Sequence, residues 1–454
     1  MDRRVSPPQS APASFRVPGF DVPISASPDV CVVGGGAAGV AAAVGAARVG
    51  ARVLLLEKYG FCGGATVAGL SGTICGLYSS GDSPRQVVFG FAHEFAEALR
   101  ARGGLGEAIR FGHTRLVPHD AFVWKEVADG LLTDAGVVVR YHTNFLRAYL
   151  DGADRVETLL VRGPEGIHAI QPRCVVDASG DAEVVAALAG PTTFGRDGIV
   201  QTPTMVFKMG GVDMGRFLAL DPAEIDRRVV DADRSGAYDL PRHHVYLFPS
   251  PSQGEVLCNM TRITYPDGRV PLGVSGEDLS YAEMAGRRQV RAYARFLVDR
   301  VPGFAGAHLV DSGTQVGIRQ TRSIVGMRRL SNRDVETGRK SPGAVTFSAW
   351  PIEVHSNEGP GVTIRYLEDD TYDIPFETLI PKVGRNVLVA GRCLSAEHEA
   401  LASARVTAQC FGMGYGAGAA AGLLLAAGLN AQELGGDQVR DWMRAHQLKS
   451  PEEP

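Results

Sequence analysis

The sequence lacks any C-x-x-C pair, although it contains seven cysteines. The cysteines are scattered and odd in number, so the ligand spacing of a structural zinc site, an iron–sulfur cluster or a redox-active dithiol is missing. We therefore expect no metal site. Scattered free thiols are typical of a reducing compartment, and we expect a cytoplasmic protein.

A strong charge of either sign is also missing. The 46 Lys and Arg residues nearly balance the 50 Asp and Glu residues, which leaves a formal net charge of −4. This balance favours neither nucleic acid nor an anionic membrane as a partner. The longest apolar run, near Gly416–Leu429, is rich in Ala and Gly and too short to span a bilayer. We expect no membrane span.

Residues 1–28 are rich in Pro and Ser and contain no apolar core of a signal peptide. We expect a disordered tail or a strap over the surface.

Glycine is abundant, with 56 in 454 residues. The first glycine cluster follows a short run of mostly β-branched residues, 29–33, which predicts a buried parallel strand. The small apolar residues 37–49 predict a helix that ends at Gly50, and residues 52–57 predict a second strand. These elements form a β-α-β unit of roughly 30 residues.

The middle of the chain has a different character. Residues 119–136 predict an amphipathic helix with Phe122, Val127 and Leu132 among its buried positions. From about 194, short alternating strands surround a long helix near 281–301, which predicts an antiparallel sheet with a helical cover. Near the end, residues 386–391 predict a strand entering glycine and residues 410–425 a helix of small residues.

We therefore predict an α/β fold with a discontinuous Rossmann-like nucleotide-binding domain. It comprises residues 29–193 and 376–445. A mixed α+β substrate domain built on the antiparallel sheet, residues 194–375, is inserted between them.

The segment Gly34-Gly35-Gly36-Ala37-Ala38-Gly39 fits G-x-G-x-x-G between a predicted strand and a predicted helix. Gly34 would allow the tight turn, Gly36 the approach of the backbone to a pyrophosphate, and Gly39 the packing of the helix on the sheet. The free N–H groups at the start of the helix attract phosphate. Glu57, about 20 residues later, can accept hydrogen bonds from ribose hydroxyls. The motif predicts a dinucleotide but does not separate FAD from NAD.

Several further stretches follow in a characteristic order: 57–66, 176–181, 319–322, 374–376 and 386–396. With residues 33–39 they resemble the FAD-dependent oxidoreductase family of glutathione-reductase-like flavoproteins, distant relatives of the fumarate reductase and succinate dehydrogenase flavoprotein subunits. The resemblance covers roughly residues 29 to 428. The sequence departs from the family at Cys62, where an apolar residue is usual, and at Ser179, where Thr is commoner.

The resemblance implies an FAD cofactor in an FAD-binding domain, with its pyrophosphate at the first helix. Gly63, Gly64 and Thr66 would lie beside the ribityl chain or the flavin. A helix starting near Gly412 would direct its N–H groups at the flavin O2 edge. The full set of implied FAD-binding residues is Gly34, Gly36, Ala37, Ala38, Gly39, Glu57, Lys58, Gly63, Gly64, Ala65, Thr66, Asp177, Ser179, Gly180, Gly391, Arg392, Gly412 and Gly414.

Five residues in or near these stretches are candidates for catalysis. Since a flavin accepts the hydride itself, the protein must hold the substrate and manage a proton. His355 and His398 are the candidate proton acceptors, and the alternative for each is a structural histidine. Arg319, Arg322 and Arg405 could clamp a carboxylate or polarise a carbonyl, or form ion pairs between the domains.

We predict an FAD-dependent dehydrogenase or oxidase that removes a hydride from a small polar substrate with help from a histidine. Two alternatives stay open: a fumarate-reductase-like reductase of an activated C=C bond, and a non-catalytic flavoprotein subunit of a redox complex. No second dinucleotide motif is found, which disfavours NAD(P)H as a co-substrate. The sequence leaves open the substrate, homo-oligomerisation, covalent attachment of FAD, and whether the electron acceptor is oxygen, a quinone or a protein.

Overall fold

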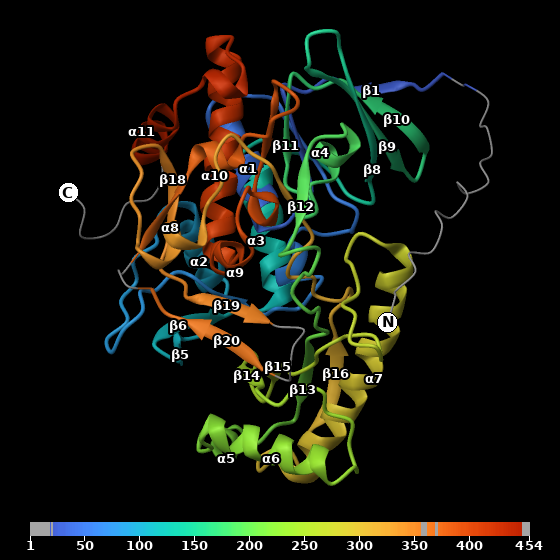
Figure 1. Ribbon diagram of the computed structural model, residues 1–454, viewed down its shortest axis with the longest axis vertical. Coiled ribbons are helices and arrows are strands. Elements are labelled where there is room, and N and C mark those ends of the chain that lie inside the picture. The colour runs from blue at the N-terminus through green and yellow to red at the C-terminus, as the bar shows by residue number, and fades with distance from the viewer. Residues whose placement is uncertain (1–18, 20, 356–360, 368–370, 447–454) are drawn as a thin grey trace, which may run out of the picture.

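The computed structural model describes residues 19, 21–355, 361–367 and 371–446 (Figure 1). The predicted N-terminal tail lies mostly outside these residues. Within it, Ile24–Ala26 forms strand β1, which pairs in parallel with β10 (Gly166–Ile170). This short segment is held by backbone hydrogen bonds at the edge of a sheet, as a strap would be.

The centre of the molecule is a five-stranded parallel sheet with the order β22-β11-β2-β3-β7. Apart from Asp177 at the end of β11, its inner strands consist of Val, Leu and Cys residues, and all of them are buried, the pattern typical of parallel sheets. The strands are β22 (Val387–Val389), β11 (Cys174–Asp177), β2 (Val30–Val33), β3 (Val53–Leu56) and β7 (Val138–Arg140).

Two helices of small residues cross at close range beside this sheet. They are α1 (Ala37–Arg48) and α10 (Thr407–Ala427). A Cβ atom on Gly414 would lie 2.1 Å from the carbonyl oxygen of Ala38, and one on Gly418 would lie 1.9 Å from that of Ala42. Only glycine lets the two backbones approach this closely. Other helices of this part are α2 (Gly90–Ala101), α3 (Ala121–Asp134), α4 (Glu183–Ala187), α8 (Asn332–Glu336), α9 (His398–Ala404) and α11 (Gly436–His446).

By length and composition α10 could cross a membrane, and 67% of its apolar window is buried inside the protein. Its packing against α1, α2 and β18 is that of a core helix.

A second sheet, antiparallel and with the order β14-β15-β13-β16, lies in the lower part of Figure 1. Its strands are β13 (Phe207–Gly210), β14 (Tyr246–Pro249), β15 (Val256–Asn259) and β16 (His308–Ser312). The long helix α7 (Gly276–Arg300) packs on it, beside α5 (Met214–Leu218) and α6 (Pro222–Arg234). These elements share a hydrophobic core separate from that of the parallel sheet. The helix begins five residues before the predicted 281, because Ser275 caps it by accepting a hydrogen bond from the Asp278 N–H.

A further four-stranded sheet, which contains β1 and β10, lies at the top of Figure 1, and the other sheets have two or three strands. The hairpin of β19 (Ile352–His355) and β20 (Val362–Arg365) lies between the parallel sheet and the β14-β15-β13-β16 sheet in Figure 1. The remaining strands are β4 (Thr73–Ile74), β5 (Ile109–Phe111), β6 (Thr114–Pro118), β8 (Asn144–Leu150), β9 (Val156–Gly163), β12 (Thr192–Phe194), β17 (Arg322–Ile324), β18 (Ala344–Ser348) and β21 (Tyr372–Pro375).

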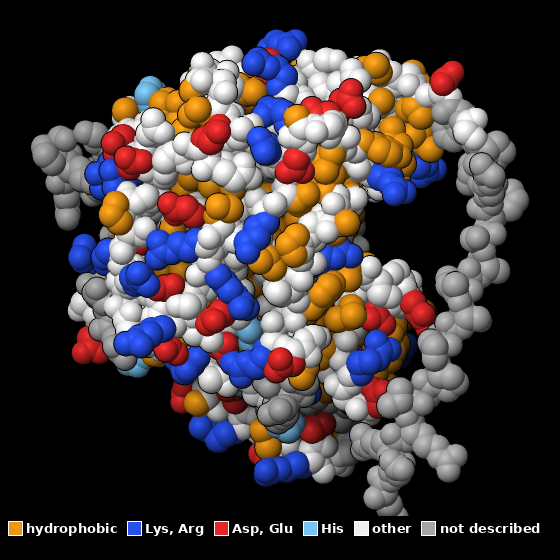
Figure 2. Space-filling model, turned by 45° about the horizontal axis from the view of Figure 1, so that its top comes forward, with side chains coloured by type: hydrophobic (Ala, Val, Ile, Leu, Met, Phe, Trp, Pro, Cys, Tyr) orange, Lys and Arg blue, Asp and Glu red, His pale blue; other side chains and the backbone are white. Residues whose placement is uncertain are grey.

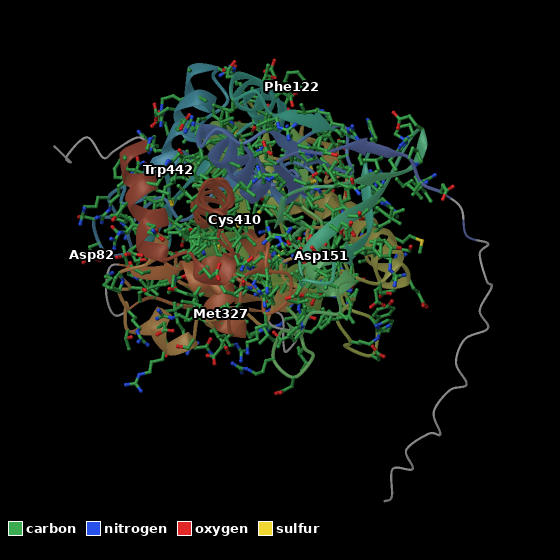
Figure 3. All side chains as sticks on the ribbon, turned by 90° about the horizontal axis from the view of Figure 1, so that it is seen from above. Asp82, Phe122, Asp151, Met327, Cys410 and Trp442 are labelled. Carbon is green, nitrogen blue, oxygen red and sulfur yellow. The ribbon has the colours of Figure 1, made fainter. Side chains whose placement is uncertain are left out.

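The prediction that Phe122 is buried was wrong, since its side chain is 65% exposed. It lies in the first turn of α3, just after the Asp120 cap. Figure 3 shows it at the periphery, whereas Cys410 lies near the middle. Figure 2 shows acidic and basic side chains interspersed over the visible face, as the small net charge suggests.

Candidate functional site

One cavity is lined from both parts of the molecule. The carboxyl ends of β2, β3, β11 and β22 contribute one set of lining residues. The strands β14, β15 and β19 contribute another. Ligands of α/β proteins bind at the carboxyl ends of parallel strands, so this is the place to look for a site.

The first set is built from the glycine motif. Gly34 has a φ of +99° and would place a Cβ 2.7 Å from the carbonyl oxygen of Ala178, so this turn requires glycine. Gly36 is the N-cap of α1 and no side chain caps the helix. Gly64 has a φ of +50°, and a Cβ on it would lie 3.0 Å from the Cα of Gly36. The uncapped N–H groups of α1 therefore open on a cavity whose walls are bare backbone, which suits a pyrophosphate.

Glu57 is fixed beside this motif. Its Oε2 accepts a hydrogen bond from the Gly35 N–H at 2.6 Å, and its Oε1 accepts one from the Tyr59 N–H at 2.9 Å. Burial raises the pKa of Glu57, while these backbone hydrogen bonds oppose the shift. The carboxylate lines the cavity and each oxygen has a further lone pair, so it can accept ribose hydroxyls.

Two loops bring charged groups together. Arg392 follows β22, and its Nη2 lies 3.3 Å from Oδ1 of Asp181, which follows β11. The buried Nη1 of Arg392 has no partner among the described residues. Glu183 also lines the cavity. Burial and the nearby charges of Asp181 and Asp177 raise the pKa of Glu183 to about 7.

A second uncapped helix reaches the same cavity. The N-cap of α10 is Val406, no side chain caps the helix, and Val406, Thr407 and Cys410 line the cavity. The predicted helix start near Gly412 was wrong, because α10 begins at Thr407. Gly412 instead packs against Thr346.

The second set centres on two residues of β19. Glu353 and His355 are two apart on one strand and therefore share a face. His355 Nε2 lies 3.1 Å from Glu353 Oε1, and Trp350 Nε1 donates to Glu353 Oε2 at 3.3 Å. Both residues line the cavity and both are buried.

The pKa values of Glu353 and His355 are both lowered, which favours an ionised carboxylate and a neutral imidazole. Burial alone would raise the pKa of Glu353, but the hydrogen bond from His355 and the positive charges of Arg405 and Arg319 lower it. Burial and the positive charge of Arg319 hold the pKa of His355 well below its usual value, against the pull of Glu353. At neutral pH a neutral His355 therefore donates its Nε2–H to an ionised Glu353. Its Nδ1 keeps a lone pair.

Two arginines line the cavity beside this pair. Arg319 donates from Nη1 to the Thr202 carbonyl at 2.6 Å, and from Nη2 to Asn259 Oδ1 at 3.4 Å. Arg405 donates from Nη2 to Gln201 Oε1 at 3.3 Å. Burial lowers the pKa of both arginines.

A third arginine, Arg242, is buried behind them and donates to the same Asn259 oxygen at 2.8 Å. Its guanidinium lies over the Tyr246 ring, 5.0 Å from the centroid. Next to this group the wall is aromatic, formed by Phe111, Tyr246, Phe248 and Trp350.

The structure brings most of the predicted residues together. Those that line the cavity are Gly34, Gly36, Ala37, Ala38, Glu57, Lys58, Gly63, Gly64, Ala65, Thr66, Ser179, Gly180, Gly391, Arg392, His355, Arg319 and Arg405. The other predicted residues, which are not among the lining residues, are Gly39, Asp177, Gly412, Gly414, Arg322 and His398.

Those six residues have other contacts. Gly39 packs against the Gly34 carbonyl and Gly414 against Ala38. Asp177 is fully buried and accepts hydrogen bonds from the Ser179 hydroxyl and the Val184 N–H, at the start of α4.

The other two catalytic candidates, Arg322 and His398, are not among the lining residues. Arg322 lies over the Phe194 ring and donates to the Asp181 carbonyl. His398 is the first residue of α9, and burial and the charges of Arg196 and Arg405 lower its pKa to about 4.

The sequence predictions missed Glu353, Asn259, Tyr246 and Arg242. Only Glu353 had a signal, its position two residues before His355 in a strand-like stretch. Among the residues that the structure describes, no group of three or more His, Cys, Asp or Glu is placed to hold a metal ion.

Comparison with known protein families gives a match that spans nearly the whole chain. Residues 29–443 match the sequence model of a family described as FAD dependent oxidoreductase. No curated protein matches the sequence.

Among solved structures, a geranylgeranyl bacteriochlorophyll reductase-like protein from Thermoplasma acidophilum is similar. Its identity is 13% and its TM-score 0.47, over 92% of this chain and 82% of that one. The anhydrotetracycline hydroxylase OxyS from Streptomyces rimosus has 16% identity and a TM-score of 0.44, over 92% of this chain. This chain spans 65% of the hydroxylase. The myxobacterial chondrochloren halogenase CndH has 17% identity and a TM-score of 0.42, over 92% and 78%.

Proposed function

Because this chain belongs to the FAD dependent oxidoreductase family and its cofactor is FAD, we propose that it oxidises a small polar substrate at the Glu353–His355 end of the cavity. The observation that supports this proposal is that one and the same cavity extends over two sites. At one end it is lined by the glycine-rich backbone that suits a dinucleotide. At the other end it is lined by the buried His355, which is hydrogen-bonded to the carboxylate of Glu353.

The residues present suit FAD. The uncapped N-terminus of α1 and Arg392 would hold the pyrophosphate, and Glu57 the adenosine ribose. The uncapped N-terminus of α10 would face the flavin, where its N–H groups favour negative charge. When bound, FAD supplies the acceptor for a hydride from the substrate.

The chain itself then has to manage a proton. When a C–H bond next to an O–H or N–H group is oxidised, the heteroatom loses a proton as the carbon loses the hydride. His355 Nδ1 is the acceptor we assign to that proton, since Nε2 is committed to Glu353. Glu353 positions the imidazole and stabilises the imidazolium that forms, as the carboxylate does in other histidine–carboxylate pairs. It is a positioning residue.

In this proposal the antiparallel sheet and α7 form the substrate domain. The sheet contributes Tyr246, Phe248 and Asn259 to the cavity wall. Side chains on this sheet would therefore set substrate specificity, while the parallel sheet holds the cofactor.

Anaerobic stopped-flow mixing of the FAD-loaded protein with candidate alcohols, amines and hydroxy acids tests the proposal. A substrate bleaches the flavin absorbance. We expect His355→Ala to slow this bleaching by roughly 10²–10⁴-fold, the usual contribution of a general base. Glu353→Gln should slow it less and shift its pH profile.

His398→Ala is the control, because this histidine is half-buried and does not line the cavity. Bleaching that is equally fast in His355→Ala and the native protein would contradict the assignment of the base. If no donor bleaches the flavin but activated enoates reoxidise dithionite-reduced protein, the reaction runs in the reductive direction instead.

A further inference from the structure

We infer that the substrate is a carboxylic acid with an aromatic or bulky apolar body, bound as its carboxylate between Arg319, Arg405 and Tyr246. This inference rests on the proposed function, because it concerns the ligand of the same cavity. It is carried by unpartnered donors, by the balance of buried charge and by the aromatic wall.

Unpartnered buried polar atoms gather around the Glu353–His355 pair, and each can donate a hydrogen bond. Arg405 Nε and the Tyr246 hydroxyl are buried, have no partner among the described residues and belong to residues that line the cavity. Arg242 Nη2 and Gln201 Nε2, just behind them, are also buried without a partner among the described residues. Such donors are costly to bury, so the group that fits here is a hydrogen-bond acceptor.

The charges lead to the same conclusion. Arg319 and Arg405 form no ion pair with any described residue, and only Glu353, with a neutral His355 beside it, offsets their charge. Arg242, behind them, adds a third cation, whose charge Asp226 offsets in part. Burying positive charge without a partner is unfavourable, and a ligand carboxylate would restore the balance. Arginine is suited to this task because its planar donors match the two carboxylate oxygens.

The wall next to these cations determines what the carboxylate is attached to. Phe111 stacks on Trp350 with centroids 5.5 Å apart, and it meets Tyr246 edge to face at 4.9 Å. Phe248, Leu116 and Val406 extend the same apolar cluster and also line the cavity. An aromatic ring or a bulky apolar group would pack here, whereas a short hydrophilic acid would leave this surface exposed.

Binding to the FAD-loaded protein tests the inference without turnover. The probes are benzoate, its neutral analogue benzamide, and acetate, followed through the visible spectrum of the bound flavin and through the melting temperature. Benzoate should bind at least tenfold more tightly than benzamide, which lacks the charge, and than acetate, which lacks the ring. Binding that is equal for benzoate and benzamide would overturn the role of the carboxylate. Acetate binding as tightly as benzoate would overturn the role of the aromatic wall.

Variants locate the binding. Arg319→Met and Arg405→Met should each weaken benzoate binding by roughly tenfold or more, and Tyr246→Phe by less. Arg328→Met is the control, since Arg328 is half-buried, donates to Ser341 and lies outside the cavity lining. Equal loss in Arg328→Met would show that the effect is general.

If either Met variant fails to fold, Arg319→Lys and Arg405→Lys replace it in the benzoate titration, because they keep the positive charge. Unchanged benzoate binding in them would contradict recognition by the paired guanidinium donors. These binding results are independent of the flavin reduction rates, so the inference and the proposed function can fail separately.

Discussion

The close crossing of α1 and α10 gives a sharp test of the fold that positions the cofactor. A Cβ on Gly418 would lie 1.9 Å from the Ala42 carbonyl oxygen, and ordinary contact begins near 3.4 Å. The Gly418→Ala variant therefore has to separate two backbones by about 1.5 Å, and neither can rotate away. Such overpacking costs about 1–3 kcal/mol, and the upper end applies because both neighbours are backbone.

Alanine also improves helix propensity by about 1 kcal/mol, which reduces the net loss to about 2 kcal/mol. The control is Gly130→Ala in α3, where the nearest atom to the new Cβ is Arg102 Nη2 at 3.5 Å. That variant gains propensity without a clash, so the two should differ by about 3 kcal/mol in the free energy of unfolding.

The assay compares melting temperatures of the two FAD-loaded variants and the fraction of FAD that each retains. We expect Gly418→Ala to melt several degrees below Gly130→Ala. We also expect it to lose FAD more readily, because α1 carries the phosphate-binding turn. Equal melting temperatures and equal FAD content would refute the close packing of the two helices.

Two further predictions concern the cofactor. Glu57→Gln should weaken FAD binding by roughly tenfold in a fluorescence titration, because charge-assisted hydrogen bonds to the ribose are lost; unchanged affinity would remove Glu57 from the site. FAD should bind more weakly as the pH rises through about 7, because Glu183 then ionises beside the phosphate-binding turn. Glu183→Gln should abolish this dependence, and a dependence that persists in the variant would assign it to another group.

The cofactor half of the site could be predicted because its signals are local. A strand, a glycine turn, a helix and an acidic residue on the next strand are contiguous within the first 60 residues. Neighbouring residues fix each feature, since the turn at Gly34 needs a positive φ and the buried strands need apolar residues on both faces.

The substrate half could be predicted only in part because it depends on distant contacts. Arg319 and Arg322 look equivalent in sequence, but the chain enters β17 at Arg322, whose partner across the ladder is Phe194. Its side chain is thereby held on Phe194 and outside the cavity lining. Arg242 is 77 residues before Arg319, and the two are linked through Asn259 Oδ1, to which both donate. No local pattern reports such a contact.

The two halves of the proposed substrate site are linked by electrostatics. His355 is buried among cations that hold its pKa well below the usual value, which keeps it neutral but makes it a weak base. A carboxylate bound to Arg319 and Arg405 would offset those charges, and the pKa of His355 would rise. The imidazole would then be a stronger proton acceptor only while an acidic substrate is in place, where the proton has to be removed. Arg319 and Arg405 would therefore recognise the substrate carboxylate, and the bound carboxylate would in turn make His355 a stronger base.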